Sequence, residues 1–169
     1  GEGSDSVLAR LTITRGHDKY SGGGILCENS SPTISNCKIT RNSSDFGGGI
    51  CFIEASPTIS DCEITENSSL DGGGIAFTYS SGTIAGCIIS NNIASQSGGG
   101  GLLGSNSTVI ISDCTVEDNS GRVGGGFYCQ YCSSTIVSSV LRGNYAEFAG
   151  GAISAYGAAP TVRECDISG

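Results

Sequence analysis

Three carboxylates are the side chains whose types and spacing come closest to a catalytic group. Asp61 and Glu63 are two residues apart, so in a strand both would point to the same face, and Asp113 lies on a comparable segment further along. Such a set could act as general acid and base or bind Ca²⁺. Lys38 precedes Glu63 by 25 residues, however, and we favour a surface ion pair worth about 0 to 1 kcal/mol. No catalytic residue is therefore predicted.

The nine cysteines offer a second kind of chemistry. Cys129 and Cys132 form a close pair, but neither a second pair nor a histidine accompanies them, so no zinc site, no other metal and no cofactor is predicted. Free cysteine behaves as a small buried apolar residue, and we interpret one regularly spaced set as an internal thiol ladder, with a disulfide network as the alternative. This set is Cys37, Cys62, Cys87, Cys114 and Cys165.

The cysteine set keeps step with two other columns of residues. A Gly-Gly-Gly-Ile run at residues 22–25 recurs at 47–50 and 72–75, and in looser form up to residues 150–153. An asparagine column shows successive intervals of 25, 25, 27 and 25 residues: Asn42, Asn67, Asn92, Asn119 and Asn144. A fixed period of this size indicates one supersecondary unit that is stacked many times. We expect the asparagine amides to hydrogen-bond between successive units.

Within one repeat, the apolar residues alternate in short bursts, which is typical of strands and not of helices. In residues 22–46, three such bursts are separated by Ser-, Asn- and Pro-rich turns. The sequence thus predicts an all-β parallel solenoid with about 25 residues and three short strands per coil, and six to seven coils. We expect a single domain over residues 1–169, with an irregular first coil (1–21), five full coils (22–149) and an incomplete last coil (150–169).

The outer face of the first strand in each coil is unusually apolar. Exposed apolar stripes usually bind a partner or a ligand, and its tyrosines could stack on sugar rings. The alternative is that loops or an adjacent chain cover the stripe. The predicted binding residues are Leu26, Cys51, Ile53, Leu103, Tyr128, Gln130 and Tyr156.

Two further patterns carry weaker predictions. The middle strands place threonines such as Thr33 and Thr58 at equivalent positions in successive coils, a pattern that would suit an ice-binding face. The second hydroxyl position of these strands, however, is occupied by Val137 and Arg163 in the last coils. The β-propensity of threonine therefore explains the pattern. Four asparagines begin Asn-x-Ser/Thr sequons for N-glycosylation. Two of them belong to the asparagine column, where a glycan would conflict with side-chain amides that point into the rod. The four are Asn29, Asn42, Asn67 and Asn106.

Charge and hydropathy narrow the classes of partner. The formal net charge is -8 and the pI is about 4.4, which disfavours nucleic acid and anionic membrane surfaces. No apolar run reaches the roughly 18 to 20 residues of a membrane span, so this segment is not expected to insert into a membrane. We expect an extracellular or cell-surface location.

The repeats resemble those of known families. In polymorphic outer-membrane proteins, Gly-Gly-Ala-aliphatic motifs alternate with Phe-x-x-Asn motifs. The repeats here resemble them in Gly-Gly-Ala-Ile at residues 150–153 and in spaced pairs such as Ile39 and Asn42. They depart from them in having an aliphatic residue in place of the Phe. Residues 11–14 and 31–37 resemble parallel β-helix repeats of the pectate-lyase-like superfamily. This resemblance implies a right-handed, single-stranded β-helix, in a superfamily that includes adhesins, scaffolds, polysaccharide lyases and hydrolases.

These observations favour a non-catalytic structural or adhesive module. Neither end of the sequence supplies a capping element, so we expect the coil edges to meet either flanking domains of a longer chain or other copies, stacked end to end in a filament. Glycans are further expected partners. The alternative is a carbohydrate-binding or polysaccharide-degrading domain, with Asp61, Glu63 and Asp113 as its candidate catalytic residues, and ice binding is a minor alternative.

Overall fold

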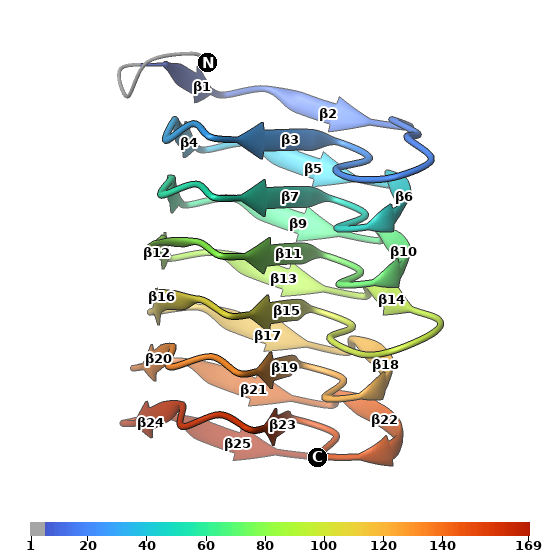
Figure 1. Cartoon of the computed structure of the whole chain (residues 1–169), viewed down its shortest axis with the longest axis vertical. Helices are drawn as coiled ribbons and strands as arrows, with labels where there is room; N and C mark the ends of the chain where they lie inside the picture. Colours follow the sequence, from blue (N-terminus) through green and yellow to red (C-terminus); the bar gives the residue numbers. More distant parts are fainter. Residues whose placement is uncertain (1–5) are drawn as a thin grey trace.

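The chain is a rod of stacked coils in which every regular element is a short strand. The computed structural model describes residues 6–169, and none of these residues lies in a helix. Each strand pairs in parallel with the equivalent strand of the next coil, so four sheets run along the rod (Figure 1). Residues 1–5 of the predicted first coil lie outside the described residues.

Three of the sheets correspond to the three predicted strands of each coil. The first-strand sheet contains β3 (Ile25–Glu28), β7 (Ile50–Ile53), β11 (Ile75–Thr78), β15 (Leu102–Ser105), β19 (Phe127–Gln130) and β23 (Ile153–Tyr156). The middle-strand sheet contains β1 (Val7–Ala9), β4 (Thr33–Ser35), β8 (Thr58–Ser60), β12 (Ser81–Ala85), β16 (Thr108–Ser112), β20 (Thr135–Val137) and β24 (Thr161–Arg163). The third-strand sheet contains β2 (Thr12–Thr14), β5 (Lys38–Thr40), β9 (Glu63–Thr65), β13 (Ile88–Ser90), β17 (Thr115–Glu117), β21 (Val140–Arg142) and β25 (Asp166–Ser168).

A fourth strand replaces what the sequence predicts as a turn, so the expected count of three strands per coil is too low. This corner sheet contains β6 (Ser43–Phe46), β10 (Ser68–Asp71), β14 (Ile93–Ala94), β18 (Ser120–Val123) and β22 (Tyr145–Ala149). The first two of these strands, β6 and β10, are rich in Ser and Asp and have little β-propensity of their own. They are held because the backbone N–H of Ser68 donates to the carbonyl of Asn42 (3.0 Å), and equivalent bonds recur from coil to coil.

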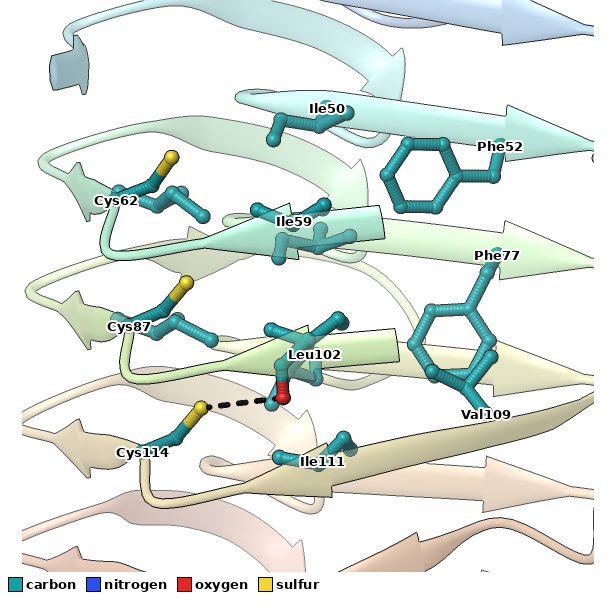
Figure 2. Close-up of a cluster of buried hydrophobic side chains, with 14 of the residues drawn as sticks. Ile50, Phe52, Ile59, Cys62, Phe77, Cys87, Leu102, Val109, Ile111 and Cys114 are labelled. Carbon is teal, nitrogen blue, oxygen red and sulfur yellow. Dashed lines mark hydrogen bonds between the residues drawn. The ribbon is translucent and has the colours of Figure 1, made fainter. Parts of the chain in front are cut away.

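The core is a set of side-chain columns that run along the rod axis. The apolar residues at the start of each first strand, such as Ile50 and Ile75, are fully buried. Phe77 and Phe127 lie 6.2 Å apart between ring centroids. Gly104 pairs in register with Phe77, and a Cβ there would come within 2.6 Å of the Phe77 ring. Figure 2 shows these columns, with the sulfur atoms of the cysteine column one above another.

The asparagine column forms a continuous chain of hydrogen bonds inside the rod. The Oδ1 atom of Asn67 accepts from the backbone N–H and from Nδ2 of Asn42, both at 3.0 Å. Its Nδ2 donates to Asn92 Oδ1 (3.0 Å) and to the carbonyl of Ile39 (2.9 Å). The same pattern continues through Asn119 to Asn144. These bonds satisfy every amide while it is buried, as the interior of a protein requires.

The glycine run lies against this ladder. Gly47 has a φ of 66°, which glycine adopts at no steric cost. Gly49 needs glycine for a different reason: a Cβ there would come within 2.6 Å of the Gly74 carbonyl oxygen and 3.0 Å of Asn67 Nδ2. The run therefore lets the chain leave the corner sheet and enter the first strand in contact with the next coil.

Candidate binding cleft

The predicted apolar stripe is interrupted. Leu26 and Tyr156 are exposed, but Cys51 is fully buried and Leu103 nearly so, contrary to the expectation of an exposed stripe. The cause is the glycine run, which folds over the outer face of the sheet and places the Gly47 Cβ position 2.9 Å from Cys51 Cβ. The stripe is thus partly covered by its own chain.

Beside this cover, the outer face of the first-strand sheet opens into a cleft of about 580 Å³. Its floor comes from β11, β15 and β19 and contains three of the predicted binding residues, Leu103, Tyr128 and Gln130. Its wall comes from the corner sheet and from the loop between β14 and β15, which projects outward from the rod (Figure 1). The wall residues are Phe46, Asp71, Gln96, Ser97, Arg122, Val123 and Phe148.

The charged groups of the cleft are held in place. One oxygen of Asp71 accepts the backbone N–H of Ser97 at 2.9 Å. Arg122 donates to the Gln96 carbonyl (3.1 Å), pairs with Glu147 (3.4 Å) and lies over the Phe148 ring at 4.7 Å from its centroid. The bonds from Asp71 and Arg122 thus fix the projecting loop to the corner strands β10 and β18, one on each side of it.

Tyr128 is the aromatic side chain that joins floor and wall. It is half-buried, and this burial raises the pKa of its hydroxyl, with smaller contributions from Tyr156 and the Asp71 carboxylate. Its hydroxyl is therefore a neutral hydrogen-bonding group at physiological pH. Together with Phe46 and Phe148 it gives the cleft three aromatic rings next to amide and hydroxyl groups.

Four predicted binding residues lie outside this cleft. Cys51 is buried, and Ile53, Leu26 and Tyr156 lie elsewhere on the same sheet. Tyr156 contacts the Tyr131 ring edge to face at 5.5 Å between centroids. The predicted stripe therefore contributes only its middle part to the cleft.

The wall residues were missed because they lie in segments predicted to be turns. A signal was present: the residue directly before each glycine run varies, and Phe46 and Asp71 occupy that position in neighbouring coils, paired in register. Val123 occupies it two coils later. The varied position beside the nearly constant glycine run was therefore the sequence signal for the wall of the cleft.

The three candidate catalytic carboxylates do not converge. Glu63 pairs with Lys38 at 2.7 Å on an exposed surface, as the ion-pair interpretation expects. Asp61 and Asp113 lie in the turns that follow β8 and β16, two coils apart, which corresponds to about 9.6 Å along the rod. None of the three lines the cleft.

The cysteine column is a chain of buried polar contacts. Cys62 Sγ donates to the Ser60 carbonyl (3.2 Å) and accepts the backbone N–H of Cys37 (3.4 Å). Ser139 fills the same role in its coil, since its Oγ accepts the backbone N–H of Cys114 at 3.1 Å. Within residues 6–169, seven cysteines are free, and a disulfide joins the remaining two, Cys129 and Cys132.

Within residues 6–169, no group of three or more His, Cys, Asp or Glu side chains is arranged to hold a metal ion. No helix of a length and apolarity that would cross a membrane occurs in the same part of the chain.

A family model described as the right handed beta helix region matches residues 23–169. A search of curated proteins found no match to the chain.

Proposed function

Because the chain belongs to the right-handed β-helix family, whose fold serves enzymes and non-enzymes alike, we propose its function from the cleft and not from the fold. We propose that the chain is a non-catalytic adhesive module of an extracellular or cell-surface protein, and that it binds glycans in the cleft. The rod displays the cleft at a fixed place on a rigid scaffold.

The observation that carries this proposal is the composition of the cleft. Sugar rings have an apolar face that packs on aromatic side chains and hydroxyl groups that need hydrogen-bond partners. Phe46, Tyr128 and Phe148 supply the aromatic surface, and Gln96 and Gln130 supply amides. A volume of about 580 Å³ falls within the range of small-molecule sites.

Charge favours a neutral glycan. The cleft contains one carboxylate, Asp71, and one guanidinium, Arg122, which already pairs with Glu147. The chain as a whole carries a formal charge of -8. A polyanionic polysaccharide would be repelled by this charge, whereas a neutral one would not.

The disulfide supports the proposed location. Disulfides persist in oxidising environments such as the extracellular space and are rare in the cytosol. Cys129 and Cys132 are both buried in one coil of the rod, where the bridge closes the turn after β19. The resemblance to polymorphic outer-membrane proteins agrees with a surface location.

A polysaccharide-degrading enzyme is the second candidate. The observation that favours it is that Asp71 and Arg122, an acidic and a basic group, line the same cleft. They replace Asp61, Glu63 and Asp113 as the residues to test.

The experiment is a screen of neutral and acidic polysaccharides, each with and without Ca²⁺, that measures both bound polymer and newly formed chain ends. We expect binding to neutral glycans without cleavage. Asp71→Asn is the matched variant for catalysis. Cleavage that this variant abolishes would replace the adhesive function with the enzymatic one, and failure to bind any polymer would refute the glycan proposal.

A further inference from the structure

The structure divides four chemically similar sequons into two kinds. Asn42 and Asn67 are each 1% exposed, and their amide nitrogens donate within the asparagine ladder. Asn29 and Asn106 are exposed, and both occupy the turn that directly follows the first strand, with φ values of 49° and 47°. The same tripeptide pattern is thus internal in one pair and presented to solvent in the other.

Asn106 is the better presented of the exposed pair. Its Nδ2 donates to the hydroxyl of the adjacent Ser105 (3.1 Å), and Thr108, the third residue of its sequon, is exposed. In the Asn29 sequon, the third residue is Ser31, whose hydroxyl accepts the backbone N–H of Ser56 (3.1 Å). Pro32 then follows and stiffens the backbone.

A hollow beside Asn106 has room for a sugar. It has a volume of about 490 Å³, and its lining includes Glu54, Ser56, Tyr79 and Thr108. Tyr79 is 66% exposed and lies in the equivalent turn of the preceding coil, because Thr78 pairs in register with Ser105. The backbones of the two turns are therefore about 4.8 Å apart, as neighbouring strands are, and both residues line the hollow. The exposed ring can support the apolar face of a sugar attached to Asn106.

We propose that Asn106 is an N-glycosylation site and that the first sugar packs on Tyr79. In the reaction, Asn106 Nδ2 attacks the anomeric carbon of an oligosaccharide carried on a lipid pyrophosphate. The carbon–nitrogen bond forms, the carbon–oxygen bond to the pyrophosphate breaks, and Nδ2 loses one proton as the lipid pyrophosphate leaves. The inference goes beyond glycan binding in the cleft and requires only passage through a secretory compartment that holds the transferase and this donor.

The test is to direct the chain into the secretory pathway of cultured animal cells and to map occupancy at each sequon by mass spectrometry after enzymatic release of the glycans. We expect Asn106 to be occupied in most molecules, Asn29 in fewer, and Asn42 and Asn67 in none. Protein that is retained inside the cells is mapped in the same way, so that poor secretion does not hide the result. The outcome is independent of whether the cleft binds a ligand.

Thr108→Ala keeps Asn106 but removes the sequon, and it should remove one glycan from the intact mass. Occupied Asn42 or Asn67 in folded protein, or an unmodified Asn106, would overturn the assignment. For the sugar contact, glycans are trimmed to the first sugar and the melting temperature is compared with that of the fully deglycosylated protein. We expect the first sugar to raise the melting temperature by about 1 to 3 °C in the native chain and to leave that of Tyr79→Ala unchanged. An equal rise in both proteins would refute the packing on Tyr79.

Discussion

At the scale of single residues, the asparagine ladder depends on the amide group more than on the volume of its side chains. Asn92 accepts the backbone N–H and Nδ2 of Asn67 and donates to the Ile64 carbonyl and to Asn119 Oδ1. Since each of these partners is buried, Asn92→Ala leaves several polar groups without a hydrogen bond. Each such group destabilises the folded state by about 1 to 3 kcal/mol.

We therefore expect Asn92→Ala to lower the free energy of unfolding by about 3 to 5 kcal/mol, measured by urea denaturation. Asn36→Gly is the control, because Asn36 is exposed and has a φ of 52°, which glycine adopts freely. It should change stability by less than about 1 kcal/mol. Equal losses in the two variants would mean that the ladder does not stabilise the rod.

The cysteines carry a prediction on thiol reactivity. In native protein at pH 8, a thiol reagent should modify at most Cys165, which is only half-buried. After denaturation without reduction, the seven free cysteines of residues 6–169 should react, and after reduction all nine of the sequence. Fewer than seven reactive cysteines in the unreduced, denatured chain would favour the disulfide network, which is the alternative interpretation of the cysteine spacing.

The same burial predicts how stability depends on pH. Burial raises the pKa of Cys27 to about 11 and that of Cys51 to about 12, above the value of about 8.5 for an unfolded thiol. Because a raised pKa keeps the folded thiol neutral while the unfolded one ionises, this stabilisation is complete below about pH 8.5 and is lost as the pH rises to 11 to 12. Cys51→Ala should make the alkaline loss measured by thermal unfolding less steep; an unchanged slope would contradict this cause.

At the scale of elements, the glycine run carries the sharpest prediction. Gly49→Ala would place a methyl group against the Gly74 carbonyl oxygen and Asn67 Nδ2, neither of which can retreat. We expect this change to lower the free energy of unfolding, measured by chemical denaturation, by about 1 to 3 kcal/mol, as at other overpacked sites. The control is Gly86→Asn in the turn after β12, where φ is 62° and the equivalent residues of the neighbouring coils are Asp61 and Asp113. A harmless Gly49→Ala would show that the coils can separate locally.

The elements also show how far the sequence could predict the structure. The first, middle and third strands were predictable because their inward residues, such as Ile50 and Ile64, alternate with outward ones. The corner strands were not, because Ser43–Phe46 has no such alternation and its strand is defined by backbone pairing with neighbouring coils. For the same reason, the floor residues Leu103 and Tyr128 were predicted, whereas the wall residues were not.

At the scale of the whole molecule, the edge of the last coil predicts association. Val162 and Ile167 continue the columns of Ile136 and Leu141 but are 38% and 49% exposed. A further coil or a second copy would cover them and pair the free edges of the strands. We expect the 169-residue chain to associate as concentration rises in sedimentation equilibrium, and Val162→Lys to weaken this. A chain that stays monomeric at the highest concentration would contradict end-to-end stacking.

We propose that the rod binds a glycan in its cleft without cleaving it. The most direct measurement is a titration of the chain with neutral oligosaccharides by calorimetry, with the sugar recovered afterwards and its chain length determined. We predict saturable binding of sugar that is recovered intact, weakened at least about tenfold by Tyr128→Ala in the cleft and unchanged by Tyr79→Ala outside it. Shortened sugar would show that the chain cleaves glycans, and binding that Tyr128→Ala leaves intact would show that the cleft is not the binding site.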